Sequence, residues 1–478
     1  MGIFFTPENG ECADFIPYYN EDTKTYELYY LHDFRDIKKM GEGCPWYRLT
    51  TKNFVTFHED GEVLPRGGRE EQDLFVYTGC VIKKDDLYHI FYTGHNHHLL
   101  DMGKRVEAVM HATSQDGLHW DKIPEDTFYA PEDEPIEKHD WRDPFVFWNT
   151  EENKWWMLLC TRKLHGPSKR RGAVGLLVSD DLKNWDYTGS LWDPSLCWAP
   201  ECPDMFAWGK YWYLIYSTYC EHEGMRTYYR ISDSPRGPWQ VIGDGALDSR
   251  SFYAGKTVTD GQNRFLVGWN PTKDGNRDCG VNQWGGHLIA HQLIQHPNGK
   301  LSVSMPSGIA SCFDEQPPRS YSAAIGESQV NGDSVVLWPK TGFSAVETGN
   351  IPSHCMITFC LEVSKDIVGA GVMLRTEQDL EKGYFIRFEA DGDNGYMVFD
   401  STDRWCEHPE SRRKIALHPK ASHRVTLLLD GTVLLAYFDN ETALSARMYD
   451  FDGSHLAFFA LDGMAKFSEI SARQHIHR

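Results

Sequence analysis

The sequence has no long apolar run, no leader-like start and no excess of basic residues. A membrane-spanning helix needs a run of about 18 apolar residues or more, so we expect none. Residues 1–8 have neither a basic start nor an apolar core, so we expect no secretory signal peptide. The net charge of −21 argues against nucleic acid or an anionic membrane surface as a partner. These absences predict a cytoplasmic protein that binds neither nucleic acid nor a membrane.

The 12 cysteines lack the regular spacing of a disulfide framework or a zinc site. Many stand inside apolar runs, as Cys80 and Cys160 do, and we interpret them as small buried hydrophobic residues in a reducing compartment. The histidine-rich stretch 94–98 has no second ligand cluster at a fixed spacing, and Cys197 and Cys202 have no partner pair further along. We therefore expect no metal and no cofactor, and we interpret 94–98 as a loop at the rim of a pocket.

Amphipathic helices are also missing from the N-terminal part of the chain, where a strand pattern repeats instead. Apolar, aromatic-rich runs recur at residues 26–30, 87–92, 154–159, 211–217 and 264–269. Between them lie polar turns that each lead to an aromatic residue, at 51–57, 114–120, 179–185 and 232–239. Four-stranded units with such a period are the signature of a β-propeller. We expect a five-bladed catalytic propeller over residues 1–312.

The composition changes beyond the repeats, and 478 residues are too many for one compact core. Pro317 and Pro318 lie in a polar stretch that predicts a linker over 313–334. From 335 to 478, alternating strands are separated by turns such as Asp430-Gly431. This pattern predicts an antiparallel β-sandwich. The predicted fold is therefore all-β, with an N-terminal five-bladed propeller followed by a C-terminal sandwich.

Three acidic residues, Asp14, Asp143 and Glu201, each precede a strand-like run of a different repeat. The innermost strands of a propeller begin near the central channel on one face, so we expect the three carboxyl groups to meet at one funnel. Crowded carboxyl groups have pKa values that are pushed apart, so that one stays ionised while another keeps its proton. Glycoside hydrolysis needs this division between a nucleophile or base and a general acid. The plainer alternative is that Asp14 and Glu201 cap turns while Arg142 and Asp143 form a structural ion pair.

Two short motifs surround these acids in a specific order and spacing, Trp141-Arg142-Asp143-Pro144 and Glu201-Cys202-Pro203-Asp204. They resemble the RDP and EC motifs of glycoside hydrolase family 32, the β-fructofuranosidases. Other segments that are similar to this family lie at 91–94, 44–48, 252–254, 284–286 and 430–439. The resemblance spans nearly the whole chain and implies the same combination of propeller and sandwich.

The resemblance also implies a role for each acid. Asp14 would be the nucleophile that forms a covalent fructosyl-enzyme, and Glu201 would be the general acid/base. Asp143, with Arg142, would hold sugar hydroxyls and stabilise the transition state. The sequence departs from the family at the nucleophile, because residues 10–17 lack the Trp and both Asn of the family's WMNDPNG motif. The floor of the pocket is therefore changed, and fructosides other than sucrose, or other furanosides, stay open as substrates.

Four aromatic residues join Arg142 in the predicted substrate-binding set. Trp46 and Trp198 are candidates for stacking against a sugar ring, with packing between blades as the alternative. Tyr253 falls on the channel side in the repeat register, and Phe91 belongs to the segment that resembles the family's FYTG strand.

The predicted function is hydrolysis of terminal fructofuranosyl units from short fructosides with retention of configuration. An inverting arabinanase- or xylosidase-like furanosidase on the same architecture would also use three carboxyl groups but would form no covalent intermediate. A fructosyltransferase would share the intermediate, and a non-catalytic sugar-binding propeller would bind without turnover. A small carbohydrate is the expected partner, and the sequence leaves the formation of a homo-oligomer open.

Overall fold

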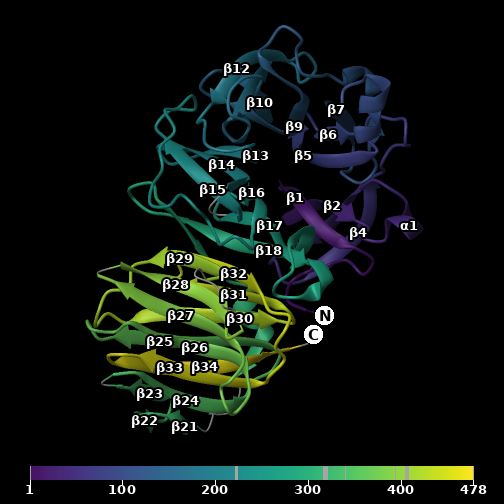
Figure 1. Cartoon of the computed structure of the whole chain (residues 1–478). Helices are drawn as coiled ribbons and strands as arrows, with labels where there is room; N and C mark the ends of the chain where they lie inside the picture. Colours follow the sequence, from purple (N-terminus) through teal and green to yellow (C-terminus); the bar gives the residue numbers. More distant parts are fainter. Residues whose placement is uncertain are drawn as a thin grey trace.

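The computed structural model describes residues 2–220, 224–315, 321–339, 341–392, 394–403 and 409–476. Figure 1 shows two β-domains, a propeller coloured purple to teal and a sandwich coloured green to yellow, which confirms the predicted fold class. None of the helices in the described ranges combines the length and apolarity that a membrane span requires. The helical segments are α1 (Ile37–Met40), η1 (His97–Met102), η2 (Pro124–Asp126), η3 (Ser168–Arg170), η4 (Asp274–Asn276) and η5 (Ile309–Cys312).

Five antiparallel blades make up the propeller, and the recurring runs of the sequence are their second strands. Blade 1 comprises β1 (Glu11–Asn20), β2 (Thr25–Asp33), β3 (Trp46–Thr51) and β4 (Phe57–Leu64). Blade 2 comprises β5 (Phe75–Lys84), β6 (Leu87–His95), β7 (Glu107–Ser114) and β8 (Asp121–Lys122). Blade 3 comprises β9 (Ile136–Asn149), β10 (Lys154–Lys163), β11 (Gly172–Ser179) and β12 (Asp186–Trp192). Blade 4 comprises β13 (Glu201–Trp208), β14 (Tyr211–Cys220) and β15 (Gly224–Ser232), and blade 5 comprises β16 (Tyr253–Thr259), β17 (Arg264–Lys273), β18 (Asn282–Gln295) and β19 (Leu301–Ser304).

The ring closes where the first and last blades meet. Cys12 of β1 pairs with Gly286 of β18, so blades 1 and 5 form one continuous sheet. Close approach is possible because Gly286 has no side chain, and a Cβ there would lie 1.8 Å from the carbonyl oxygen of Asn270. This junction holds the start of β1, and therefore Asp14, at the channel.

Three of the four polar turns of the sequence repeat, at 51–57, 114–120 and 179–185, have one hydrogen-bonding pattern. Ser114 Oγ accepts from the backbone N–H of Gly117 at 2.9 Å, and Asp116 Oδ1 accepts from the next two backbone N–H groups at 2.8 and 2.9 Å. Ser179 and Asp181 make the same bonds one blade later. Such side-chain caps replace ladder hydrogen bonds at a turn, which explains why the repeat keeps these residue types.

Two antiparallel sheets form the sandwich, and their inner faces enclose a core of fully buried aliphatic and aromatic side chains. One sheet has the order β22-β23-β34-β25-β30-β31-β32 with β20 beside β34, and the other has the order β21-β24-β33-β26-β27-β28-β29. The strands are β20 (Phe313–Glu315), β21 (Ser322–Ile325), β22 (Ser328–Asn331), β23 (Ser334–Leu337), β24 (Phe343–Asn350), β25 (His354–Val363), β26 (Gly369–Thr376), β27 (Tyr384–Asp391), β28 (Asn394–Ser401), β29 (Ser411–Ile415), β30 (His423–Asp430), β31 (Val433–Phe438), β32 (Thr442–Arg447), β33 (His455–Leu461) and β34 (Ala465–His475).

The predicted linker over 313–334 is wrong in its described part. β20, β21 and β22 lie within it and pair with β34, β24 and β23, so these residues belong to the two sheets of the sandwich. Edge strands this short carry too little periodicity to be distinguished from a loop in the sequence. Pro317 and Pro318 lie outside the described residues.

The two domains share a buried polar network. Asp248 of the propeller accepts a hydrogen bond from the backbone N–H of Ser445 in β32 at 2.8 Å. His291 lies 2.9 Å from the other oxygen of Asp248 through Nε2, and 2.9 Å from the Tyr437 hydroxyl through Nδ1. Apolar side chains of both domains surround this network in one cluster. The sandwich is therefore packed against blades 4 and 5 (Figure 1).

Candidate active site

Each innermost strand of the propeller has a β-bulge at the same place in its blade. The bulges follow Ala13, Tyr77, Arg142, Glu201 and Tyr253. In four blades the next residue has a positive φ: Asp14 (33°), Asp143 (59°), Cys202 (50°) and Ala254 (52°). Positive φ is uncommon for residues other than glycine, and strained positions of this kind cluster at functional sites. Since a bulge turns side chains away from the regular alternation, it aims these residues differently from the rest of the strand.

The three acids do not occupy the same position in their blades. Asp14 and Asp143 are both first residues of their bulges, but Glu201 stands one residue earlier, at the position that Arg142 occupies in blade 3. Blade 5 has Tyr253 at this earlier position and blade 1 has Ala13. The site is thus built from two adjacent rings of residues.

Each oxygen of Asp14 accepts a hydrogen bond from an oxygen or nitrogen donor. Thr78 Oγ1 donates to Oδ2 at 2.6 Å, and Trp269 Nε1 donates to Oδ1 at 2.9 Å. Burial raises the pKa of Asp14, the two donors oppose this rise, and the charge of Glu201 adds to it. The two hydrogen bonds fix the orientation of the carboxyl group and favour its ionised form, which a nucleophile requires.

Asp143 is buried beside the backbone of blade 4. Its Oδ2 accepts from the N–H of Cys202 at 2.9 Å, and its own N–H donates to Thr93 Oγ1 at 2.8 Å. Burial raises the pKa of Asp143 to about 7, the Arg142 guanidinium lowers it, and the charge of Glu201 raises it. Near neutral pH, Asp143 can therefore both donate and accept hydrogen bonds toward a hydroxyl group.

One carboxylate oxygen of Glu201 accepts a hydrogen bond from a guanidinium group, and the other accepts one from a phenol hydroxyl. Arg142 Nη2 donates to Oε1 at 3.1 Å, and the Tyr253 hydroxyl donates a short hydrogen bond to Oε2. Burial raises the pKa of Tyr253 well above its usual value, so its hydroxyl keeps the proton that it donates. Both oxygens of Glu201 are therefore oriented by side chains of neighbouring blades.

Cys202 connects two of the acids. Besides its backbone bond to Asp143, its Sγ lies 3.9 Å from Asp14 Oδ2 and 3.9 Å from Thr78 Oγ1. Burial raises the pKa of the Cys202 thiol well above its usual value, so it remains a neutral weak donor rather than a second nucleophile.

A further layer of charged residues supports Arg142. Arg142 Nη1 donates to Asp140 Oδ1 at 2.9 Å, and Arg162 Nη1 donates to Asp140 Oδ2 at 3.2 Å. The Arg162 guanidinium also lies 3.5 Å above the ring of Trp198, which is 38% exposed. Trp198 is thus rigidly held by a cation–π contact near the site, with part of its ring open to solvent.

Two residues of the predicted substrate-binding set do not fit that role. Trp46 is completely buried, and its Nε1 donates to the carbonyl oxygen of Val76 at 3.0 Å. Phe91 is 1% exposed and stacks on His111 at 4.4 Å. Neither ring has a face for a sugar, so we assign both to packing between blades.

Four residues at the site were missed in the sequence. The acids and Arg142 are contacted by Thr78 and Thr93 of blade 2, Asp140 of blade 3 and Trp269 of blade 5. We predicted a catalytic or binding role for none of them from the sequence. Thr93 lies in the segment 91–94, and Asp140 directly precedes the motif that begins at Trp141, but neither position indicated its contact in advance. Thr78 occupies the place of Asp14 and Asp143 in the bulge of blade 2.

Carboxyl groups gathered at the channel of a five-bladed propeller, beside an arginine and a phenol, are the groups that a glycoside hydrolase needs. The family described as Glycosyl hydrolases family 32 N-terminal domain matches residues 7–303, which is more than half of the chain. The protein therefore belongs to glycosyl hydrolase family 32, as its motifs predicted, and it is a β-fructofuranosidase-like enzyme.

Relatives and solved structures agree with this membership. The chain is 22% identical to the levanbiose-producing levanase of Bacillus subtilis (strain 168), over 98% of this chain and 89% of the levanase. It is 29% identical to a probable sucrose-6-phosphate hydrolase of Psychromonas ingrahamii, over 86% of this chain and 71% of that protein. The exo-inulinase of Aspergillus awamori has the same fold, with a TM-score of 0.74 and 16% identity over 99% of this chain and 98% of the inulinase.

Proposed function

We propose that the enzyme removes terminal fructofuranosyl units from short fructosides by a retaining double displacement, with Asp14 as nucleophile and Glu201 as general acid/base. One observation carries this assignment. Trp269, the donor to Asp14, and Tyr253, the donor to Glu201, are paired on adjacent strands with ring centroids 5.6 Å apart. The two acids are therefore held by neighbouring side chains, which supports the short separation between carboxyl groups that a retaining mechanism needs.

In the first step, an oxygen of Asp14 attacks the anomeric carbon of the fructosyl unit. The bond to the leaving oxygen breaks, and Glu201 gives its proton to that oxygen. In the second step, Glu201 takes a proton from water, whose oxygen attacks the same carbon and releases Asp14.

Asp143 and Arg142 hold the sugar in this proposal. An oxocarbenium-like transition state gains from hydrogen bonds that strengthen as charge develops on the ring. Asp143 is fixed by the backbone of Cys202, and Arg142 by Asp140, so neither has to reorganise when the sugar binds. Trp198 and Tyr253 are proposed to line the same pocket.

We propose a short fructoside as the substrate and the cytoplasm as the place of action. A propeller funnel ends in a pocket, which favours removal of one terminal sugar. The names of relatives support a small fructoside, since they include raffinose invertase and sucrose-6-phosphate hydrolase of Escherichia coli. Ala13, in place of the asparagine that the family motif has before the nucleophile, supports a fructoside other than sucrose.

The test is to trap the intermediate. Glu201→Gln protein, mixed with a fructoside that has a good leaving group, is expected to gain the mass of one fructosyl unit, and peptide mapping is expected to place it on Asp14. Asp14→Asn protein serves as the control and should gain nothing. NMR of the wild-type reaction should show the retained anomer first, and an inverted first product would contradict the mechanism. A kcat/KM that rises steadily with chain length would contradict the short substrate.

A further inference from the structure

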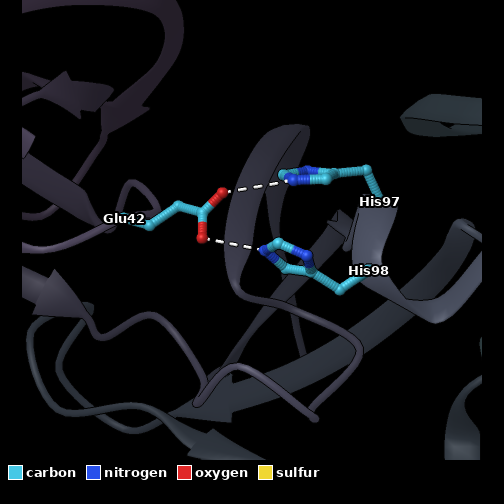
Figure 2. Close-up of side chains that lie close together, drawn as sticks. All are labelled: Glu42, His97 and His98. Atoms are coloured by element: carbon cyan, nitrogen blue, oxygen red, sulfur yellow. Dashed lines mark hydrogen bonds and ion pairs between the residues drawn. The ribbon is translucent and has the colours of Figure 1, made fainter. Parts of the chain in front are cut away.

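Two loops on neighbouring blades bring together one glutamate and two histidines. Glu42 lies between α1 and β3, and His97 and His98 begin η1 after β6. Figure 2 shows both imidazole rings on the same side of the carboxylate, each aimed at a different oxygen. His97 Nε2 lies 3.2 Å from Oε1 and His98 Nε2 lies 2.8 Å from Oε2. The histidine-rich stretch therefore has a third potential ligand, which the sequence alone did not place beside it.

We propose that Glu42, His97 and His98 bind one divalent transition-metal ion of the Zn²⁺ class. Imidazole nitrogens favour zinc, nickel or copper over magnesium and calcium, which prefer all-oxygen sites. Zinc takes such ligands at about 2.0–2.2 Å, so tetrahedral neighbours lie about 3.3 Å apart. All three ligand atoms lie within 4.8 Å of one another, so small side-chain movements suffice. Water completes the coordination.

The loop that carries the histidines is already fixed in place. Asn96 is completely buried, and its side-chain nitrogen donates to the carbonyl oxygens of Arg69 at 2.8 Å and Glu71 at 2.6 Å. Its Oδ1 accepts from the backbone N–H of His98 at 3.0 Å. Little ordering entropy is therefore lost when an ion binds, and this raises affinity.

Arg69 contacts two of the proposed ligands and would compete with the ion for them. Its Nη2 lies 3.3 Å from His98 Nδ1, and its Nη1 lies 3.6 Å from Glu42 Oε2. Arginine can only donate, so His98 Nδ1 accepts and Nε2 carries the proton that faces Glu42. Metal binding needs the other tautomer, with Nδ1 protonated and Nε2 bare. The Arg69 side chain is 71% exposed and can turn into solvent.

The cluster lies at the rim of the funnel, outside the acids of the proposed reaction. The ring of His97 lies 5.8 Å from Phe75, which lies 5.5 Å from Tyr77, the residue before Thr78. A bound ion would therefore tie the loops of blades 1 and 2 together and stabilise the rim.

The test is titration of the full-length, metal-stripped enzyme with ZnCl₂ by calorimetry. We expect one ion per chain, and a Tm that rises with Zn²⁺. Even outer-shell substitutions weaken metal binding by about 10- to 100-fold, so His97→Ala and His98→Ala should each lose at least about tenfold in affinity. His119→Ala is the matched control, because His119 is exposed and lies 2.7 Å from a single carboxylate, Asp116. Its affinity should equal that of the wild type.

Several results would overturn the site. The site would be excluded if the wild type bound no Zn²⁺. It would also be excluded if His98→Ala, shown to be folded by its Tm without metal, bound Zn²⁺ as tightly as the wild type. Arg69→Ala should bind Zn²⁺ as tightly as the wild type or more tightly, and weaker binding would mean that Arg69 supports the ion rather than competes with it. Since binding is measured and not hydrolysis, the result does not depend on the proposed reaction.

Discussion

Tyr253 and Trp269 face each other on β16 and β17, and each donates a hydrogen bond to a different acid. Tyr253 bonds to Glu201 and Trp269 bonds to Asp14, with the two rings 5.6 Å apart. In the described site, blade 5 supplies these donors and none of the three acids. Blade 5 therefore fixes the position of the proposed acid/base, Glu201, relative to the proposed nucleophile, Asp14. Substitutions that remove a donor to either acid can test this arrangement.

Tyr253→Phe should slow catalysis while the fold is retained. The substitution removes the donor to Glu201 and keeps the ring that packs on Trp269. A hydrogen bond to a charged group contributes about 1.5–3 kcal/mol, so we expect kcat to fall about 10- to 100-fold, with a smaller change in KM. Steady-state kinetics on a short fructoside measures both. Tyr19→Phe, on the ring that packs against Tyr26, is the control, and an equal loss there would remove the special role of Tyr253.

Thr78→Val should move the acidic limb of the pH profile. Burial raises the pKa of Asp14, and the hydrogen bond from the Thr78 hydroxyl lowers it. Without this donor the pKa of Asp14 rises further, and a nucleophile that must be ionised is lost at a higher pH. The acidic limb of kcat/KM should therefore shift to higher pH. Thr78→Ser keeps the hydroxyl and should keep the wild-type profile, and identical profiles for both variants would contradict the role of the hydrogen bond.

Asp143→Asn should be nearly inactive but more stable at alkaline pH. Folding raises the pKa of Asp143 to about 7 through burial, whereas an unfolded aspartate has a pKa of about 3.9. The folded state thus binds this proton more tightly than the unfolded state does. The resulting stabilisation of the folded wild type is fully present below about pH 4 and is lost as the pH rises through about 7. The Tm of Asp143→Asn minus that of the wild type should therefore increase from pH 5 to pH 8. A difference in Tm that does not change with pH would mean that burial of the ionised Asp143 costs nothing.

Repetition made the fold and the acids predictable. Five runs of one type identified the second strands of the blades, and the acids preceding three of them identified the innermost strands. Asp14 and Asp143 follow this logic fully, since they share one position in their bulges. Family membership is confirmed by the match over residues 7–303, while the roles of the three acids stay predictions.

The aromatic residues were less predictable, for a physical reason. A strand alternates its side chains between two faces, but a bulge adds a residue and reverses the alternation beyond it. Tyr253 stands just before its bulge and donates to Glu201. Trp46 lies on the third strand of its blade and Phe91 on the second, away from the bulges, and both pack between blades. Donors such as Trp269 come from another blade, and no local pattern connects them to the acid that they serve.

Asp248→Ala should destabilise the enzyme more than any surface substitution, because it breaks the network between the domains. Asp248 accepts from the buried backbone N–H of Ser445 and lies 2.9 Å from the buried ring of His291. Each buried polar group left without its hydrogen-bond partner costs about 1–3 kcal/mol. Urea unfolding measures this loss. Asp180→Ala, which removes an exposed ion pair with Lys154, should cost less than about 1 kcal/mol. At temperatures where Asp248→Ala remains folded, its kcat should match the wild type, since the acids are held within the blades. Equal stability losses in the two variants would mean that the propeller and the sandwich do not depend on this network.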